Sequence, residues 1–429
     1  MSLFLGTMHQ HIPGRKSLTE HSPLKHLLPE KEVYIPLIAG NNTDLEVLVQ
    51  EGDRVKIGTK LAQTRSGFEV PIYSSVSGTY KGLVKRMHQS LKPQQHMVIE
   101  LDHQQESIQS FEPLDYEKAS REECVDLVKQ AGIIGLGGAG FPAYVKYGKV
   151  DGVDCVLINA VECEPYITAD YCSVMNDVDD LILGCAIMKK MADVEEVYIC
   201  IKESHPDLIE KVSQACTAGI SVKKVPDVYP MGWERVLVRE VLHKEYGNLP
   251  AEAGAIVGNA STAIAIAKAF TKGETIHEKI LTVSGEGVKD PCNVCVPVGM
   301  AVSEIMQACG GYTSEDVRLI AGGPMMGKTI VNDQFVIDRA TNAITVLPHT
   351  PDDEIACLRC GRCSDHCPAG LQPVRISMAA QANDVDAMIA RGAQSCIECG
   401  MCSYICPSHI NVTENVRKAK RVIALKQQR

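Results

Sequence analysis

Residues 131–147, AGIIGLGGAGFPAYVKY, hold five glycines within the first ten positions, between an apolar strand-like run and a short helical pattern. Glycine lets backbone N–H groups come close to a phosphate or a flat ring, and a nearby lysine adds positive charge. A glycine-rich loop by itself is equally consistent with a tight turn. The stretch therefore indicates a ligand loop only if its neighbours support that interpretation.

The next motif along the chain gives that support. INAVECEPYITADY, residues 158–171, follows a buried strand and gathers Asn159, Glu162, Glu164 and Asp170 at its carboxyl end. Ligands bind at the carboxyl ends of strands in α/β sheets. A solvated acidic loop is the alternative, and the adjacent glycine loop makes it less attractive.

Strand and helix patterns alternate on both sides of these motifs, from 115 to 270. The segments 155–160, 196–201 and 253–260 have the apolar pattern of buried strands, whereas 179–192 and 261–270 have that of helices. Alternation of this kind predicts a layered α/β domain.

The regions outside this domain differ in character. Residues 31–105 alternate strands and turns in the manner of a lipoyl-like barrel-sandwich hybrid. The hairpin tip TRSGFEV (64–70) carries no lysine, which favours a fold without a swinging arm over a true carrier. Residues 271–340 indicate a β-grasp-like module, 347–415 a cysteine-rich domain, 1–30 an N-terminal extension and 416–429 a tail.

Two cysteine runs near the end of the chain share one spacing. CLRCGRCSDHCP (357–368) and CIECGMCSYICP (396–407) are both C-x2-C-x2-C-x3-C-P, the bacterial run for two 4Fe–4S clusters, in which the fourth cysteine ligates the other cluster. Zinc or unliganded thiols are the alternatives, and a repeated twelve-residue pattern disfavours both. The predicted ligand sets are Cys357, Cys360, Cys363 and Cys406 for one cluster, and Cys396, Cys399, Cys402 and Cys367 for the other.

Composition excludes several classes of function. The net charge of −10 and an aromatic content of 5% argue against nucleic-acid binding. No apolar run approaches the roughly 18 residues of a membrane span, and the N-terminus lacks the pattern of a secretory signal. We expect a cytoplasmic protein, and docking to the inner face of the cell membrane stays open.

Longer motifs carry a resemblance to a known family. GGAGFPxxxK followed by NAxExEP resembles the subunit of respiratory complex I that binds NADH and FMN. ECEPYITAD, LPAEAGAIVGNASTA, VSGEGVKDP, VPVG, GGPMMG and the order of domains resemble the RnfC family, the C subunits of Rnf electron-transfer complexes, still more closely. The resemblance implies a Rossmann-like flavin domain, an SLBB β-grasp module and a ferredoxin-like domain. It also implies that NAD(H) and FMN are held by Gly137, Gly138, Gly140, Phe141, Lys146, Asn159, Glu162, Glu164, Gly232, Glu234, Asn259 and Thr262.

Such a protein would be an NADH:acceptor oxidoreductase that transfers electrons from NADH through FMN and two 4Fe–4S clusters to a partner protein. A flavin is needed between NADH and the first cluster, because a hydride carries two electrons and a cluster accepts one at a time. Within this class the alternatives are the soluble C subunit of a membrane Rnf pump, a cobalamin reductase, and the electron-transfer protein that accompanies proline reductase. An iron–sulfur adapter without flavin is the alternative from another class.

A third cysteine motif, KDPCNVCVPVG (289–299), bears on the choice of partner. The family typically has glycine and arginine where this chain has Cys292 and Cys295. Core thiols and a partial metal site are open interpretations. The sharper hypothesis is a redox dithiol that passes electrons to a selenol- or thiol-dependent partner of the proline-reductase type.

Overall fold

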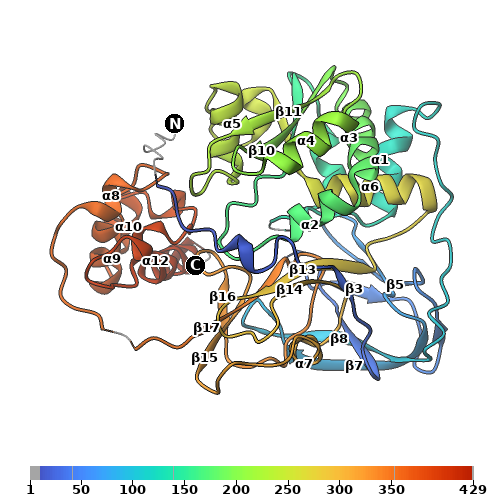
Figure 1. Ribbon diagram of the computed structural model, residues 1–429, viewed down its shortest axis with the longest axis horizontal. Helices are drawn as coiled ribbons and strands as arrows, with labels where there is room; N and C mark the ends of the chain where they lie inside the picture. The colour runs from blue at the N-terminus through green and yellow to red at the C-terminus, as the bar shows by residue number, and fades with distance from the viewer. Residues whose placement is uncertain (1–9, 41, 139, 352, 428–429) are drawn as a thin grey trace.

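The computed structural model describes residues 10–40, 42–138, 140–351 and 353–427. Figure 1 shows the α/β domain above two β-rich domains, with a helical C-terminal domain to one side, joined by an extended connection. The mixed α/β and β architecture agrees with the fold class predicted from the sequence. None of the described helices is long and apolar enough to cross a membrane.

The α/β domain is built on a parallel sheet of four strands in the order β11-β10-β9-β12. Alternate residues of β9 face opposite ways: Val156 and Ile158 pack under α1, α3, α4 and α6, while Leu157 packs under α5. Gly184 of α3 allows close contact with α6, because a Cβ there would lie 1.9 Å from the Ala263 carbonyl oxygen. The strands are β9 (Cys155–Asn159), β10 (Glu196–Lys202), β11 (Ile220–Val225) and β12 (Ala255–Asn259). The helices are α1 (Arg121–Gln130), η2 (Ala143–Tyr147), α2 (Ala169–Asn176), α3 (Val178–Ala192), α4 (Pro206–Ala215), α5 (Glu234–Leu242), η3 (Pro250–Ala253) and α6 (Ala260–Lys272).

The barrel-sandwich hybrid consists of two antiparallel sheets, β2-β8-β7-β4 and β3-β5-β6, around one core. Its tip, residues 64–70, lies beside the α/β domain, where the Glu69 carboxylate forms a 2.9 Å ion pair with Lys129. The strands are β2 (Glu32–Pro36), β3 (Leu45–Val47), β4 (Arg54–Val55), β5 (Lys60–Thr64), β6 (Pro71–Tyr73), β7 (Gly78–Met87) and β8 (Pro93–Leu101).

The β-grasp module is a six-stranded sheet, β1-β14-β13-β17-β15-β16, with α7 against it. Its edge strand β1 comes from the predicted N-terminal extension, and its strand β17 lies beyond residue 340, the predicted end of the module. Both segments belong to the module because each supplies a strand that pairs with a strand of the sheet: β1 pairs with β14, and β17 pairs with β13. The elements are η1 (Lys16–Leu18), which precedes the sheet, β1 (Lys25–His26), β13 (Glu278–Ser284), β14 (Cys292–Pro297), α7 (Val302–Ala308), β15 (Val317–Ala321), β16 (Lys328–Ile330) and β17 (Ala343–Pro348).

The C-terminal domain packs short helices around the cysteine runs. The segment between the two runs forms two helices, α9 and α10, because the chain turns at Asn383, whose φ is 53°. The predicted tail is mostly helix α12, whose Val416, Ala419 and Ile423 are buried in the core of this domain. The helices are α8 (Arg362–Asp365), α9 (Pro373–Gln381), α10 (Val385–Ala390), η4 (Ala393–Ser395), α11 (Met401–Tyr404) and α12 (Val412–Gln427).

Candidate flavin and iron–sulfur site

Two asparagines end neighbouring parallel strands at the same edge of the α/β sheet. Asn159 ends β9, Asn259 ends β12, and the two are register partners. The Asn259 side chain caps α6, since its Oδ1 accepts from the Ser261 amide at 2.9 Å. Its Nδ2 donates to Asp170 at 2.7 Å, and Asn159 Nδ2 donates to the Gly232 carbonyl at 2.7 Å. The sheet thus gathers the predicted residues Asn159, Gly232 and Asn259 around one strand edge.

The glycine loop lies against the same edge. A Cβ on Gly137 would lie 2.3 Å from Asn259 Nδ2, so only glycine fits at this contact. The Leu136 amide donates to Thr262 Oγ1 at 3.0 Å, which ties the loop to the first turn of α6. A Cβ on Gly138 would meet nothing within 4 Å. The loop therefore packs on one side and opens into free space on the other.

Charged and aromatic groups flank this loop. Lys146 donates to the Val257 carbonyl at 2.7 Å, and its Nζ lies 3.9 Å from the Glu234 carboxylate; burial lowers its pKa. Phe141 is 41% exposed, and its ring meets Phe68 of the barrel-sandwich tip edge-on at 5.5 Å. Backbone amides, one ammonium and open space over Gly138 fit a flavin phosphate and ring.

The acidic turn after β9 is held from three directions. Glu162 accepts from the Asp170 amide at 2.8 Å, at the start of α2, and burial raises its pKa to about 6. Glu164 accepts from the amides of Met325 and Met326 at 2.7 and 2.9 Å. The ammonium of Lys16 lies beneath the turn and donates to the carbonyls of Glu162 and Glu164 at 2.8 and 3.0 Å. Glu162 and Glu164 therefore belong to a built structure and not to a solvated loop.

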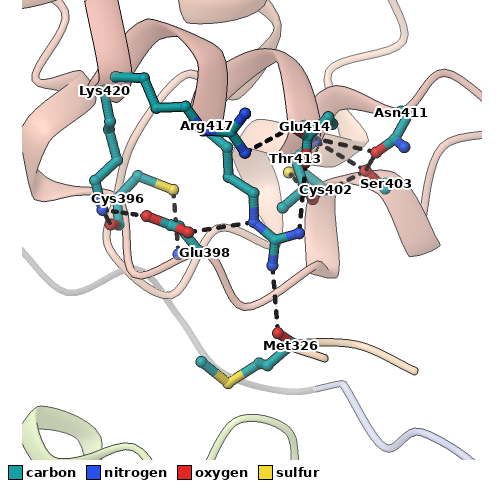
Figure 2. A network of polar contacts seen from close by, with 11 residues as sticks. Met326, Cys396, Glu398, Cys402, Ser403, Asn411, Thr413, Glu414, Arg417 and Lys420 are labelled. Carbon is teal, nitrogen blue, oxygen red and sulfur yellow. Dashed lines mark hydrogen bonds and ion pairs between the residues drawn. The ribbon is translucent and has the colours of Figure 1, made fainter. Parts of the chain in front are cut away.

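The turn also contacts the iron–sulfur domain. The Tyr229 hydroxyl lies 2.7 Å from the Cys399 carbonyl and 3.3 Å from Glu164 Oε2. The loop GGPMMG touches both domains, because a Cβ on Gly400 would lie 2.5 Å from the Met325 carbonyl oxygen. Figure 2 shows Arg417 of α12 between Glu398 and the carbonyl of Met326, at 3.2 and 3.4 Å. The second cysteine run is thereby fixed against the flavin domain.

Thiols of the two runs act electrostatically on one another, and Cys363 acts on both Cys367 and Cys402 across the predicted sets, so the ligand sets stay a prediction. Cys367, from the first run, acts electrostatically on Cys396, Cys399 and Cys402 of the second. Cys406, from the second run, acts in the same way on Cys363. Among the described residues no three His, Cys, Asp or Glu side chains come close enough to hold a single metal ion. Exchange of the fourth cysteine between the runs fits two cubane clusters.

The two sets differ in exposure. Cys367, Cys399 and Cys402 are buried, and Cys399 packs with Tyr229, Met401 and Ile12 in one apolar cluster. Cys357 and Cys360 are exposed. The set beside the flavin domain is therefore enclosed, and the other set faces solvent.

The predicted dithiol of Cys292 and Cys295 is not formed. Both lie in β14, and residues three apart on a strand point to opposite faces. Cys292 faces the core of the β-grasp module, where its Sγ lies 3.7 Å from Cys309 Sγ. The hydrogen bond between Cys292 and Cys309, in which either thiol could donate, lowers the pKa of Cys292. Cys295 lies near Glu278 of the same module and near Lys268 and Asp177 of the flavin domain, and burial raises its pKa. Both thiols are buried, so the pair offers no exit to a partner protein.

A cavity of about 290 Å³ adjoins the glycine loop between three domains. Its lining includes Gly138 and Gly140 of the loop, Met326 of the β-grasp module and Arg339. Asn159, Glu162 and Glu164 are not part of its lining, so this cavity does not reach the acidic turn.

Sequence patterns missed three contributors to this site. Tyr229 and the Met325–Met326 amides lie far from the acidic turn in sequence, and two adjacent methionines by themselves indicate only apolar packing. Lys16 lies in a segment without periodicity or motif. Met325 and Met326 did carry a signal, since they belong to the family-like motif GGPMMG, and Tyr229 lies in the stretch YPMGWE (229–234).

Family models match most of the chain in the same order of domains. Residues 7–104 match the RnfC barrel sandwich hybrid domain, 128–268 the Nuo51 FMN-binding domain, 280–329 the SLBB domain and 350–407 the 4Fe-4S dicluster domain. The FMN-binding match covers the twelve predicted flavin residues, and the dicluster match covers the eight predicted ligands.

Relatives resemble the chain along most of its length. It is 33% identical over 86% of its length, and 83% of the relative, to the C subunit of the proton-translocating ferredoxin:NAD(+) oxidoreductase complex of Clostridium ljungdahlii. It is 34% identical, over 96% of both chains, to the C subunit of the Na(+)-translocating complex of Acetobacterium woodii. A solved NAD+-reducing NiFe hydrogenase in the H2-reduced state aligns with 74% of this chain and 64% of that chain at 16% identity, with a TM-score of only 0.47. The identity to the two complex subunits shows that this chain belongs to the RnfC family.

Proposed function

We propose that the chain is an NADH-oxidising electron-transfer subunit that serves a membrane complex of the Rnf type. When bound, FMN would supply the conversion between two-electron hydride chemistry and one-electron transfer to a cluster. The residues that would hold it are the glycine loop, Lys146, the two asparagines and Thr262. The work left to the protein is to orient the nicotinamide, exclude water and bring a cluster close.

One observation carries this proposal: the acidic turn of the flavin site and the second cysteine run share a contact. Tyr229 reaches both Glu164 and the Cys399 carbonyl. Electron transfer between cofactors needs such proximity, whereas an adapter that only docks proteins has no use for it. The same contact supports the assignment of the enclosed set, Cys367, Cys396, Cys399 and Cys402, as the entry side for electrons.

The other set fits the exit side. Cys357 and Cys360 are exposed, so a partner protein can approach the cluster that they would hold. The names of the relatives point to membrane subunits of an ion-translocating complex as that partner. The hypothesis of a proline-reductase-type partner depended on a dithiol of Cys292 and Cys295. Because these two thiols point to opposite faces of β14, that hypothesis has no structural support.

The test is anaerobic reconstitution with iron, sulfide and FMN, followed by titration with NADH. We expect bound FMN, bleaching of its absorbance by NADH, and reduced-cluster signals in electron paramagnetic resonance. A reconstituted chain that holds both clusters without binding FMN would be an adapter, and the proposal would fail.

Two variants test the order of the sets. C399S should leave the flavin bleaching intact and block reduction of the remaining cluster by NADH. C360S, the matched change in the exposed set, should still allow the enclosed cluster to be reduced. If C360S blocks reduction of the enclosed cluster while C399S leaves the exposed cluster reducible, electrons enter through the exposed set instead. Bleaching of the flavin by NADH in both variants is the control for folding.

A further inference from the structure

Lys16 has a part-buried ammonium that none of the proposed electron-transfer steps uses. Its Nζ donates to the carbonyls of Glu162, Glu164 and Ile167, which all belong to the acidic turn. Three acceptors around one nitrogen require three N–H donors, and an amine has three only when it is charged. Burial lowers the pKa of this ammonium, and the neighbouring Glu162 carboxylate opposes that shift. The geometry therefore places a positive charge beneath the turn.

The segment that carries Lys16 is anchored on both sides of it. The carbonyls of Gln10 and Gly14 accept from the amides of Tyr229 and Tyr166 at 2.9 and 2.7 Å. After Lys16, Thr19 Oγ1 lies 2.7 Å from Thr168 Oγ1. In Figure 1 this N-terminal segment runs beneath the α/β domain toward the β-grasp module. Contacts of the flanking backbone and side chains therefore fix the position of Lys16 relative to the turn.

The turn needs such support because its backbone is strained. Glu162 and Tyr166 have φ angles of 41° and 69°, a region that residues other than glycine seldom adopt. Carbonyls converging on one ammonium compensate for that strain. Glu162 and Glu164 also bring two negative charges into a buried region, and a fixed cation beside them offsets part of the cost of burying them.

We propose that Lys16 is a positioning residue of the flavin site, which holds the turn of residues 162–167 in shape and supplies a fixed positive charge beside it. This inference rests on the proposed function, because it assigns the turn to a flavin. A positive charge near a flavin favours the reduced form, which gains negative charge, over the oxidised form. Loss of the charge should therefore weaken binding of reduced FMN more than binding of oxidised FMN.

The experiment uses the full chain with both clusters and two variants. K16Q removes the charge and keeps two N–H donors, whereas K16R keeps the charge with a different shape. K31M, at an exposed lysine of the same region, is the matched control. The measurements are the dissociation constant of oxidised FMN by fluorescence quenching and the flavin midpoint potential in a chemical reductant titration without NADH.

For K16Q we expect roughly ten-fold weaker binding of oxidised FMN, the loss that follows from one unmet charge-assisted contact. Its midpoint potential should fall, which means a larger loss of affinity for the reduced form. K16R should keep the midpoint potential of the wild type, and K31M should match the wild type in both measurements.

An unchanged potential in K16Q would overturn the inference, because a structural role alone weakens both redox forms equally. If K16Q does not fold, as judged by thermal unfolding, K16R decides: a retained potential supports the fixed charge and a fallen one refutes it. Failure of the wild type to bind FMN would instead refute the proposed function, so the two failures are distinguishable.

Discussion

The contact between Gly137 and Asn259 gives the sharpest test of how the flavin site is built. In G137A the new Cβ would lie 2.3 Å from Asn259 Nδ2 and 2.6 Å from its Cγ, against about 3.5–4.0 Å for an ordinary contact. Asn259 cannot move aside without breaking its cap on Ser261 and its bond to Asp170. Overpacking costs about 1–3 kcal/mol and a lost cap about 1 kcal/mol, so we expect roughly 2–4 kcal/mol of local destabilisation.

Hydrogen exchange measured by mass spectrometry on the chain without FMN would detect this loss. Peptides from β12 and α6 should exchange roughly thirty-fold to several-hundred-fold faster in G137A. G138A is the matched control, because its Cβ meets nothing within 4 Å; its exchange should equal that of the wild type, while its FMN affinity falls. Wild-type exchange in G137A would refute the assignment of Asn259 as the residue that packs against the loop.

Three further outcomes follow from other contacts. Y229F removes the hydroxyl between Glu164 and Cys399, so stopped-flow absorbance should show slower cluster reduction by NADH with flavin bleaching unchanged; an equal loss of both would place Tyr229 in NADH binding instead. Burial raises the pKa of Glu162 from 4.5 to about 6, so the folded state binds this proton more tightly, and stability should fall by roughly 2 kcal/mol as pH rises from about 4.5 to about 6. Urea unfolding of E162Q should lack that part of the pH dependence, and an unchanged profile would exclude Glu162 as its source. Treatment with diamide, a thiol oxidant, should link Cys292 to Cys309, whose sulfurs lie 3.7 Å apart and need to approach by only about 1.7 Å to form a disulfide; peptide mapping that finds Cys292 joined to Cys295 would contradict the strand geometry.

The predicted dithiol fails for a physical reason that sequence spacing conceals. C-x-x-C brings two thiols together where the chain turns or starts a helix, but a strand sends residues three apart to opposite faces. Cys292 therefore meets Cys309, which follows α7, and Cys295 meets the flavin domain. The motif could have been interpreted correctly only by recognising CNVCVP as a fully buried strand.

Local patterns in the sequence predicted the types of domain, their order and a layered α/β domain, and the family models match that order; the two cysteine sets and the flavin residues come from the same kind of pattern and stay predictions. Local patterns could do so because strand period, glycine runs and cysteine spacing are properties of short segments. The tertiary structure decided what joins those segments: Lys16 beneath the acidic turn, Tyr229 between that turn and Cys399, and Met325–Met326 on Glu164. These contacts span more than 60 residues each. No local pattern encodes them, because they depend on where the packing of separate domains places their surfaces.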